Sequence, residues 1–195
     1  MQIGDNDGLN GKVVLDIGAN DGFFTLCALK SGAREVTSID KDWSTWPQNI
    51  KYASEVWGVN PEIVTADFRV WKPSKRYDVI LFLGVLYHLQ DVFTAIEILS
   101  NFLVSSGGTI YIETQMTQVE SALPIFEYAS DIYPTIARQD KANMRHSGIS
   151  NYLFPNMHAL RNLADSYDFD FQCLDGPANL YSKENPTRQL FKFSR

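Results

Sequence analysis

Acidic and glycine residues gather directly after an apolar run near the start of the chain. Residues 16–22 read Asp-Ile-Gly-Ala-Asn-Asp-Gly. Gly18 and Gly22 allow the backbone to approach a ligand closely, and the helix expected to follow offers free N–H groups and a partial positive charge. The Asp16 carboxylate suits a ligand with an ammonium group, and Asn20 tolerates a left-handed backbone better than most residues. We therefore expect this segment to bind one end of a ligand.

Further candidate residues stand at the ends of later apolar segments. Asp40 ends the segment 35–40, and its carboxylate can accept hydrogen bonds from both vicinal hydroxyls of a ribose. Asp67 follows the segment 62–66 and can accept a hydrogen bond from an adenine amino group. The remaining cofactor-binding candidates adjoin these two carboxylates or follow the most apolar segment: Lys41, Phe68, Gly84 and Tyr87.

The spacing of the glycines separates two classes of ligand. A dinucleotide site needs G-x-G-x-x-G to cradle a pyrophosphate, whereas here Asn20 occupies the middle position between Gly18 and Gly22. Asp16 would also repel a pyrophosphate. S-adenosylmethionine carries adenosine, a ribose diol and an ammonium group but no phosphate, so the residues favour it as the cofactor.

Candidates for the acceptor side lie after the fourth and fifth expected strands and in the segment beyond them. His88 and His146 are candidate general bases, and each has an alternative role as a structural or solvated histidine. Arg145 can bind an anionic group through two parallel hydrogen bonds. No metal site is expected, and the candidate substrate-binding residues are Tyr87, Glu113, Asn143, Arg145 and Arg188.

Strand and helix patterns alternate along the chain, which predicts a mostly parallel sheet covered on both faces. The expected strands are 12–17, 35–40, 62–66, 77–83 and 109–113, and the expected helices are 23–33, 47–57, 91–104 and 156–167. Segments 168–174 and 188–194 resemble an antiparallel pair. The predicted fold class is α/β, with three Rossmann-like layers and a seven-stranded, mostly parallel sheet that carries an antiparallel edge pair at the C-terminus.

The pattern predicts a single domain over residues 1–195, in which 115–151 forms a lid over the substrate. A connection of that length is uncommon without helices of its own or a function, and 119–128 is a candidate helix within it. Asp21 is the expected cap of the first helix.

The charge and composition of the chain indicate which classes of binding partner to expect. The formal net charge is −6 and the basic residues are scattered, which favours a small-molecule substrate over a nucleic acid, although a local basic patch stays open. No apolar run is long enough to cross a bilayer and no secretory signal is visible. Cys27 and Cys173 fit reduced core positions, so a cytoplasmic location is expected. The sequence leaves the oligomeric state open.

The order VLDIGANDG, TSID, TADF, YDVILFLGVLYHL and GGTIYIET resembles the class I methyltransferases across roughly the first 115 residues. That family usually has D-x-G-x-G-x-G, so Asn20 is a departure at the middle glycine. The resemblance implies the Rossmann-like methyltransferase fold and S-adenosylmethionine as cofactor.

A narrower likeness is carried by GVLYH, GGTIYIET and NYLFPNMHALRNLADSYDF, which are similar to the tRNA wobble-uridine carboxymethyltransferases. In that family the tyrosine of GVLYH and a basic residue of the last strand help hold a carboxylated cofactor, which implies such roles for Tyr87 and Arg188. Those enzymes also carry an N-terminal extension that has no counterpart here. We therefore expect plain S-adenosylmethionine.

The expected activity is in-line methyl transfer to a small polar acceptor such as a sugar, a nucleotide or a hydroxylated metabolite. One alternative is a tRNA or RNA methyltransferase, with either plain or carboxylated S-adenosylmethionine as its cofactor. Another is a catalytically silent subunit that binds the cofactor only.

Overall fold

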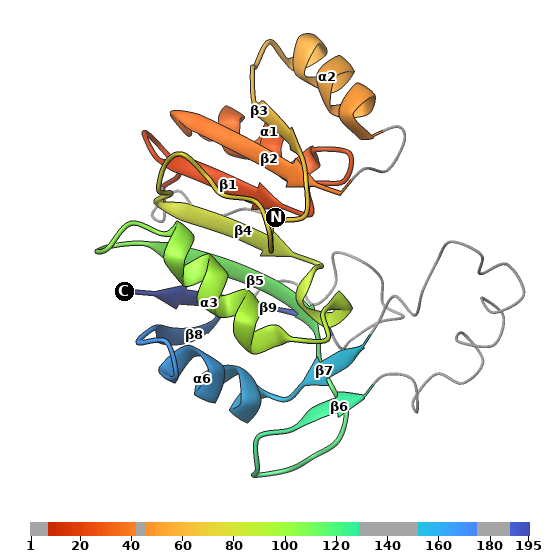
Figure 1. The fold of residues 1–195 in the computed structure, drawn as a ribbon, viewed down its shortest axis with the longest axis vertical. Helices are drawn as coiled ribbons and strands as arrows, with labels where there is room; N and C mark the ends of the chain where they lie inside the picture. Colours follow the sequence, from red (N-terminus) through yellow and green to blue (C-terminus); the bar gives the residue numbers. More distant parts are fainter. Residues whose placement is uncertain (1–7, 42–45, 129–151, 175–187) are drawn as a thin grey trace, which may run out of the picture.

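A seven-stranded sheet forms the centre of the computed structural model, which describes residues 8–41, 46–128, 152–174 and 188–195 (Figure 1). The strand order is β3-β2-β1-β4-β5-β9-β8. Its strands are β1 (Val13–Ile17), β2 (Glu35–Asp40), β3 (Glu62–Thr65), β4 (Val79–Leu83), β5 (Thr109–Gln115), β8 (Asp170–Leu174) and β9 (Arg188–Ser194). The pairs among β1 to β5 are parallel, and β9 lies antiparallel to both β5 and β8. This arrangement confirms the predicted fold class.

The most apolar strands lie at the centre of the sheet because both of their faces are covered. Every residue of β1 is buried, and so are the first four residues of β4, which is the middle strand of the seven. Strands of this kind read as continuous apolar runs rather than as alternating patterns. The centre of the sheet is therefore buried, and the candidate polar side chains Asp40 and Asp67 lie at or after the ends of its strands.

Helices cover both faces of the sheet. The helices are α1 (Phe23–Lys30), α2 (Trp46–Trp57), α3 (Val92–Phe102), α6 (Met157–Asp165) and the short 3₁₀ turn η1 (Leu86–His88). Figure 1 shows α3 and α6 in front of the sheet and α1 behind it. The Asp91 carboxylate caps α3 by accepting a hydrogen bond from the backbone N–H of Thr94 at 3.0 Å. The α3 residues that face the core follow a helical period: Val92, Ala95, Ile96, Leu99 and Phe102.

A helix over 119–128 was predicted, but residues 119–125 form a loop, and β6 (Phe126–Tyr128) follows as a strand that pairs antiparallel with β7 (Leu153–Pro155). That prediction was wrong. Pro124 disfavours a helical residue before it, and the Asn156 side chain binds the surrounding loop. Asn156 Oδ1 accepts hydrogen bonds from the backbone N–H of Ile125 at 3.1 Å and of Ala159 at 2.9 Å, so it holds the loop and caps α6 together. Its Nδ2 also donates to the carbonyl of Leu123 at 2.8 Å.

Two smaller expectations also need correction. Gly22, not Asp21, occupies the cap position of α1, and Asp21 Oδ1 accepts from the N–H of Phe23 at 3.4 Å. Neither cysteine forms a disulfide, but the core positions predicted for them were wrong: Cys27 is only partly buried, and Cys173 is exposed because β8 is an edge strand. Within the described ranges, no helix is long and apolar enough to cross a membrane. Of the expected lid, residues 129–151 lie outside the described part of the chain.

Candidate functional site

The carboxyl ends of β1, β2 and β4 meet where the strand order switches direction, which is where ligands bind in open α/β sheets. Asp40 ends β2 at this edge. Its Oδ2 accepts a hydrogen bond from the N–H of Asn20 at 2.9 Å, and its Oδ1 accepts one from the N–H of Lys41 at 2.7 Å. A carboxylate oxygen has two acceptor positions, so each oxygen of Asp40 can take a further donor. The vicinal hydroxyls of a ribose supply such a pair of donors.

The loop after β1 runs close to the loop after β4. Gly18 has a φ of 74°, and a Cβ placed on it would lie 2.5 Å from Cγ2 of Val85. Asn20 has a φ of 50°, which agrees with its predicted tolerance of the left-handed region. Gly22 closes the loop by donating its N–H to the carbonyl of Ala19 at 2.8 Å. The absence of a side chain at Gly18 therefore sets the course of the loop.

Asp16 lies beneath this loop, on the face of β1 that α1 covers. The residue is only 2% exposed, and its Oδ2 accepts a hydrogen bond from Oγ1 of Thr25 at 2.7 Å. Burial is the main cause that raises the pKa of Asp16 to about 6, while the bonds from Thr25 oppose that rise. The charge of Asp16 therefore lies inside the protein, next to the loop rather than on its surface.

Asp67 is already bound by two cations. Its oxygens accept from Nε of Arg69 at 2.9 and 3.2 Å and from Nη2 of Arg69 at 2.5 Å, and the Lys41 ammonium lies 2.9 Å from Oδ2. The Arg69 hydrogen bond holds the pKa of Asp67 well below its usual range. An adenine amino group has to displace one of these donors to reach the carboxylate. Phe68 is 6% exposed and packs edge-on against Phe82, so its side chain belongs to the core.

Tyr87, Glu113 and Arg188 form one cluster at the ends of β4, β5 and β9. Arg188 Nη2 donates to the Tyr87 hydroxyl at 2.6 Å and to Oε2 of Glu113 at 3.0 Å. Its Nε lies 2.6 Å from Oε1 of Glu113, an ion-pair contact whose N–H is not aligned for a hydrogen bond. Burial raises the pKa of Glu113, and the Arg188 charge opposes that rise. A Cβ on Gly84 would lie 3.3 Å from Arg188 Nη2, so the glycine leaves room for the cluster.

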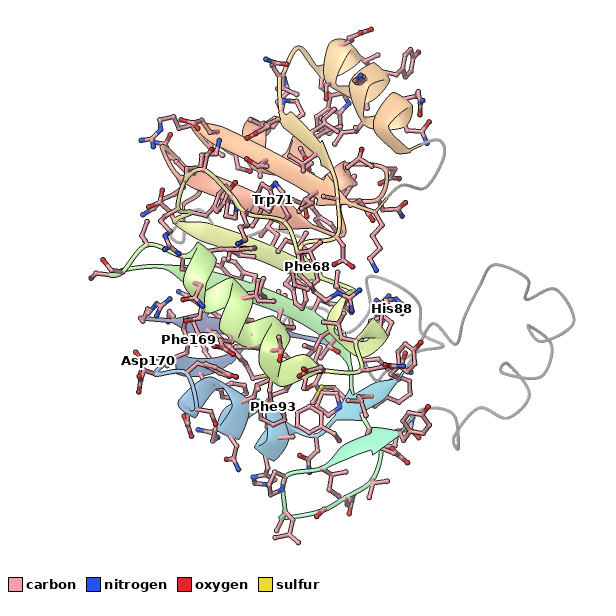
Figure 2. All side chains as sticks on the ribbon, viewed as in Figure 1. Phe68, Trp71, His88, Phe93, Phe169 and Asp170 are labelled. Atoms are coloured by element: carbon pink, nitrogen blue, oxygen red, sulfur yellow. The ribbon has the colours of Figure 1, made fainter. Side chains whose placement is uncertain are left out.

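His88 lies beside this cluster, at the end of η1. Its ring centroid is 4.2 Å from that of Tyr87, and the residue is exposed at the carboxyl end of the sheet (Figure 2). His88 therefore lies next to Tyr87, where a candidate base was predicted. The predicted residues Asn143, Arg145 and His146 lie outside the described part of the chain.

Sequence reasoning missed four residues of this edge: Thr25, Ser38, Arg69 and Val85. A threonine inside an otherwise apolar helix was a usable signal for Thr25, because a buried hydroxyl needs a partner. No comparable signal marked Arg69, since its position follows from the turn after β3.

A family model described as a methyltransferase domain matches residues 4–174. The chain belongs to this methyltransferase family. The match confirms the predicted class of enzyme, and S-adenosylmethionine, the predicted cofactor, is consistent with that class.

Two curated relatives of this chain carry the same protein name. The tRNA U34 carboxymethyltransferase of Campylobacter hominis is 26% identical over 187 residues, which cover 94% of this chain and 59% of that protein. Its counterpart in Dichelobacter nodosus is 25% identical over 190 residues, covering 95% of this chain and 55% of that protein. The methyltransferase therefore spans less than two thirds of the length of these relatives.

Solved structures show the same fold. The magnesium protoporphyrin IX methyltransferase of Synechocystis, crystallised with SAH, matches with a TM-score of 0.66 and 14% identity over 97% of this chain and 76% of that chain. The 1,6-didemethyltoxoflavin-N1-methyltransferase of Burkholderia thailandensis matches with a TM-score of 0.63 and 19% identity over 94% and 71%.

The residues at the strand ends fit the cofactor of this methyltransferase. Asp40 has spare acceptor positions for a diol, Gly18 lets the loop backbone approach, and Asp16 places a buried carboxyl group beneath the loop. In the described residues no group of histidine, cysteine and acidic side chains is arranged to hold a metal ion.

Proposed function

We propose that this methyltransferase binds S-adenosylmethionine across the ends of β1, β2 and β4 and transfers its methyl group to a small polar acceptor beside Tyr87. The observation that carries the proposal is Asp40, whose two oxygens each bind one backbone N–H and keep one position for a ribose hydroxyl. The proposed cofactor residues are those of the predicted set, except that the Phe68 side chain lies in the core and the Asp67 carboxylate is held in ion pairs with Lys41 and Arg69.

The cofactor supplies a methyl group already activated by a sulfonium, so the protein has to align the acceptor and exclude water. Alignment alone can contribute roughly 7–11 kcal/mol. Arg188 Nη2 lies 2.6 Å from the Tyr87 hydroxyl, and the Glu113 carboxylate balances the charge of the guanidinium. The cluster therefore offers oriented hydrogen-bond donors and acceptors with little net charge. That character suits a neutral polar acceptor. His88 is the proposed base when the acceptor is a hydroxyl.

The segment 115–151 is proposed as the acceptor-side wall of a single domain over 1–195. The residue directly after that segment supports the proposal, because the N–H of Tyr152, next to β7, donates to the carbonyl of Tyr87 in η1 at 2.7 Å. Asn143, Arg145 and His146 keep their proposed roles in acceptor binding and proton transfer. We also propose a cytoplasmic location.

Removing the Asp40 carboxylate tests the proposed cofactor site. Asp40→Ala is expected to weaken S-adenosylhomocysteine binding by about tenfold to a hundredfold, because hydrogen bonds to a charged group contribute about 1.5–3 kcal/mol. Titration calorimetry measures the dissociation constant. Asp170→Ala is the matched control, since Asp170 is exposed at the opposite end of the sheet from His88 (Figure 2). Equal affinity of the two variants would refute the site.

A second candidate function is favoured by the contact between Tyr87 and Arg188. These residues match the pair implied by the resemblance to tRNA carboxymethyltransferases, and the curated relatives carry that name. Under this alternative, Arg188 binds the carboxylate of a modified cofactor and the acceptor is a tRNA uridine. The Glu113 charge 2.6 Å from Arg188 opposes a second carboxylate there, which is why we rank plain S-adenosylmethionine first.

A further inference from the structure

A chain of three buried polar side chains crosses the interior beneath the loop 16–22. Asp16, Thr25 and Ser38 come from β1, α1 and β2, and they are 2%, 0% and 0% exposed. Thr25 Oγ1 lies 2.7 Å from Oδ2 of Asp16 and 2.6 Å from Oγ of Ser38. Register places Ser38 directly beside Asp16 in the sheet. Burial of polar groups costs free energy unless they bind one another, so the three side chains act as a unit.

The hydrogen bonds of this chain have a direction. A threonine hydroxyl has one proton, and Thr25 donates it to the ionised Asp16 carboxylate. The contact between Thr25 and Ser38 can then form only when the Ser38 hydroxyl donates to Thr25. Both hydroxyl dipoles therefore point their positive ends toward Asp16, which favours its charged form.

We propose that Thr25 and Ser38 are positioning residues that keep Asp16 ionised under the loop, and that they thereby set the affinity for the cationic methionine end of the cofactor. The proposal rests on the proposed function, since that function places the ammonium group at this loop. A buried charge acts strongly on a nearby ligand charge because the protein interior screens it weakly. The two hydroxyl groups thus favour the ionised form of the Asp16 carboxylate, which lies below the surface.

Two other carboxylates near Asp16 oppose its ionisation. Asp40 from β2 and Asp21 from the loop raise the pKa of Asp16, and Cys27 of α1 titrates only in the alkaline range because burial raises its pKa. The neighbour from β4 is Leu81, which does not titrate. Asp16 is therefore the group beneath the loop whose raised pKa lies between pH 5 and 8.

The expected result is a pH-dependent affinity for S-adenosylhomocysteine. Burial raises the pKa of Asp16 to about 6 from 3.8, so its charge is present above pH 6 and is lost as the pH falls through 6. The dissociation constant should rise about tenfold between pH 8 and pH 5, because about a tenth of the carboxyl is still ionised one unit below its pKa. Methylthioadenosine carries no ammonium group, and its affinity should not change over this range.

Four variants separate a positioning role from a merely structural one, with calorimetry of both ligands from pH 5 to 8. Thr25→Val removes a donor and should move the midpoint of the S-adenosylhomocysteine profile to higher pH, whereas Thr25→Ser should restore it. Ser38→Ala should shift it in the same direction by less. Ser54→Ala is the control, because this buried hydroxyl donates to the carbonyl of Ile50 at 2.6 Å and lies on α2.

The inference is overturned if the affinity of the wild type for S-adenosylhomocysteine does not change with pH. It is also overturned if Thr25→Val and Ser54→Ala have the same midpoint. In either case, binding of methylthioadenosine leaves the proposed function standing. Failure of both ligands to bind the wild type at any pH overturns the proposed function and the inference with it.

Discussion

Gly18→Ala is expected to lower the free energy of unfolding by about 2–5 kcal/mol and to abolish detectable S-adenosylhomocysteine binding. A left-handed backbone costs an alanine roughly 1–2 kcal/mol, and Gly18 has a φ of 74°. Its new Cβ would also lie 2.5 Å from Cγ2 of Val85, and overpacking of this kind costs about 1–3 kcal/mol. Relief of the contact moves the loop 16–22 away from its course. Urea unfolding and calorimetry measure the two effects.

Two companions of Gly18→Ala divide the cost into its parts. Gly107→Ala has a nearly equal φ of 75° with nothing within 4 Å of the added Cβ, so it should carry the backbone cost alone and keep the ligand affinity. Combining Gly18→Ala with Val85→Ala should recover the steric part and show coupling between the two sites. Equal destabilisation by Gly18→Ala and Gly107→Ala would contradict the close approach of the two loops.

Arg188→Met is expected to lower the free energy of unfolding by about 2–3 kcal/mol at pH 8 and to reduce methyl transfer strongly. Loss of one partner of a buried ion pair typically costs about 3–5 kcal/mol, and the side chains here keep exposures of 22% for Arg188 and 17% for Glu113, which reduces that figure. Tyr87 also loses the donor that fixes its hydroxyl. Unfolding curves and turnover of a methyl-labelled cofactor report the two losses.

The pH dependence of this loss has a definite sign. Burial raises the pKa of Glu113 above 4.5 in the folded protein, and without Arg188 the opposing influence is gone. The folded state then binds the proton of Glu113 more tightly than the unfolded chain, so the contribution of this group to stability is largest below pH 4.5 and is lost as the pH rises through the folded pKa. The cost of Arg188→Met should therefore be small in acid and full at pH 8.

Two controls accompany Arg188→Met. Arg161→Met removes an arginine that lies over the Phe171 ring at 5.0 Å, and it should cost less than about 1 kcal/mol. Glu113→Gln frees the charge of Arg188, so it should raise the affinity for a carboxylated S-adenosylmethionine above that for the plain cofactor. A wild type that already prefers the carboxylated form would replace our first candidate function with the second.

The strands and the cofactor edge could be predicted from sequence because their signals are local. Buried parallel strands appear as apolar runs, and β2 and β9 have the predicted bounds. Asn20 was recognised as a residue that accepts a positive φ, and Asp40 as the carboxylate at the end of a strand. Each of these features depends on a few neighbouring residues.

The contacts between distant residues could not be predicted in this way. The contact between Glu113 and Arg188 depends on the register of β5 with β9, across a separation of 75 residues. The helix expected over 119–128 was overridden by Asn156, whose side chain binds a loop about thirty residues earlier in the sequence. Arg69 takes the acceptor positions that sequence reasoning had left free on Asp67. All three features depend on side chains that are brought together only by the tertiary fold.

The central claim is that the cofactor lies across the ends of β1, β2 and β4, and hydrogen–deuterium exchange with and without saturating S-adenosylhomocysteine tests it most directly. Bound ligand should slow exchange in residues 16–22, 38–41 and 84–88, while α6 and β8 keep their rates. Protection confined to other segments, with these three unchanged at saturation, would contradict the account.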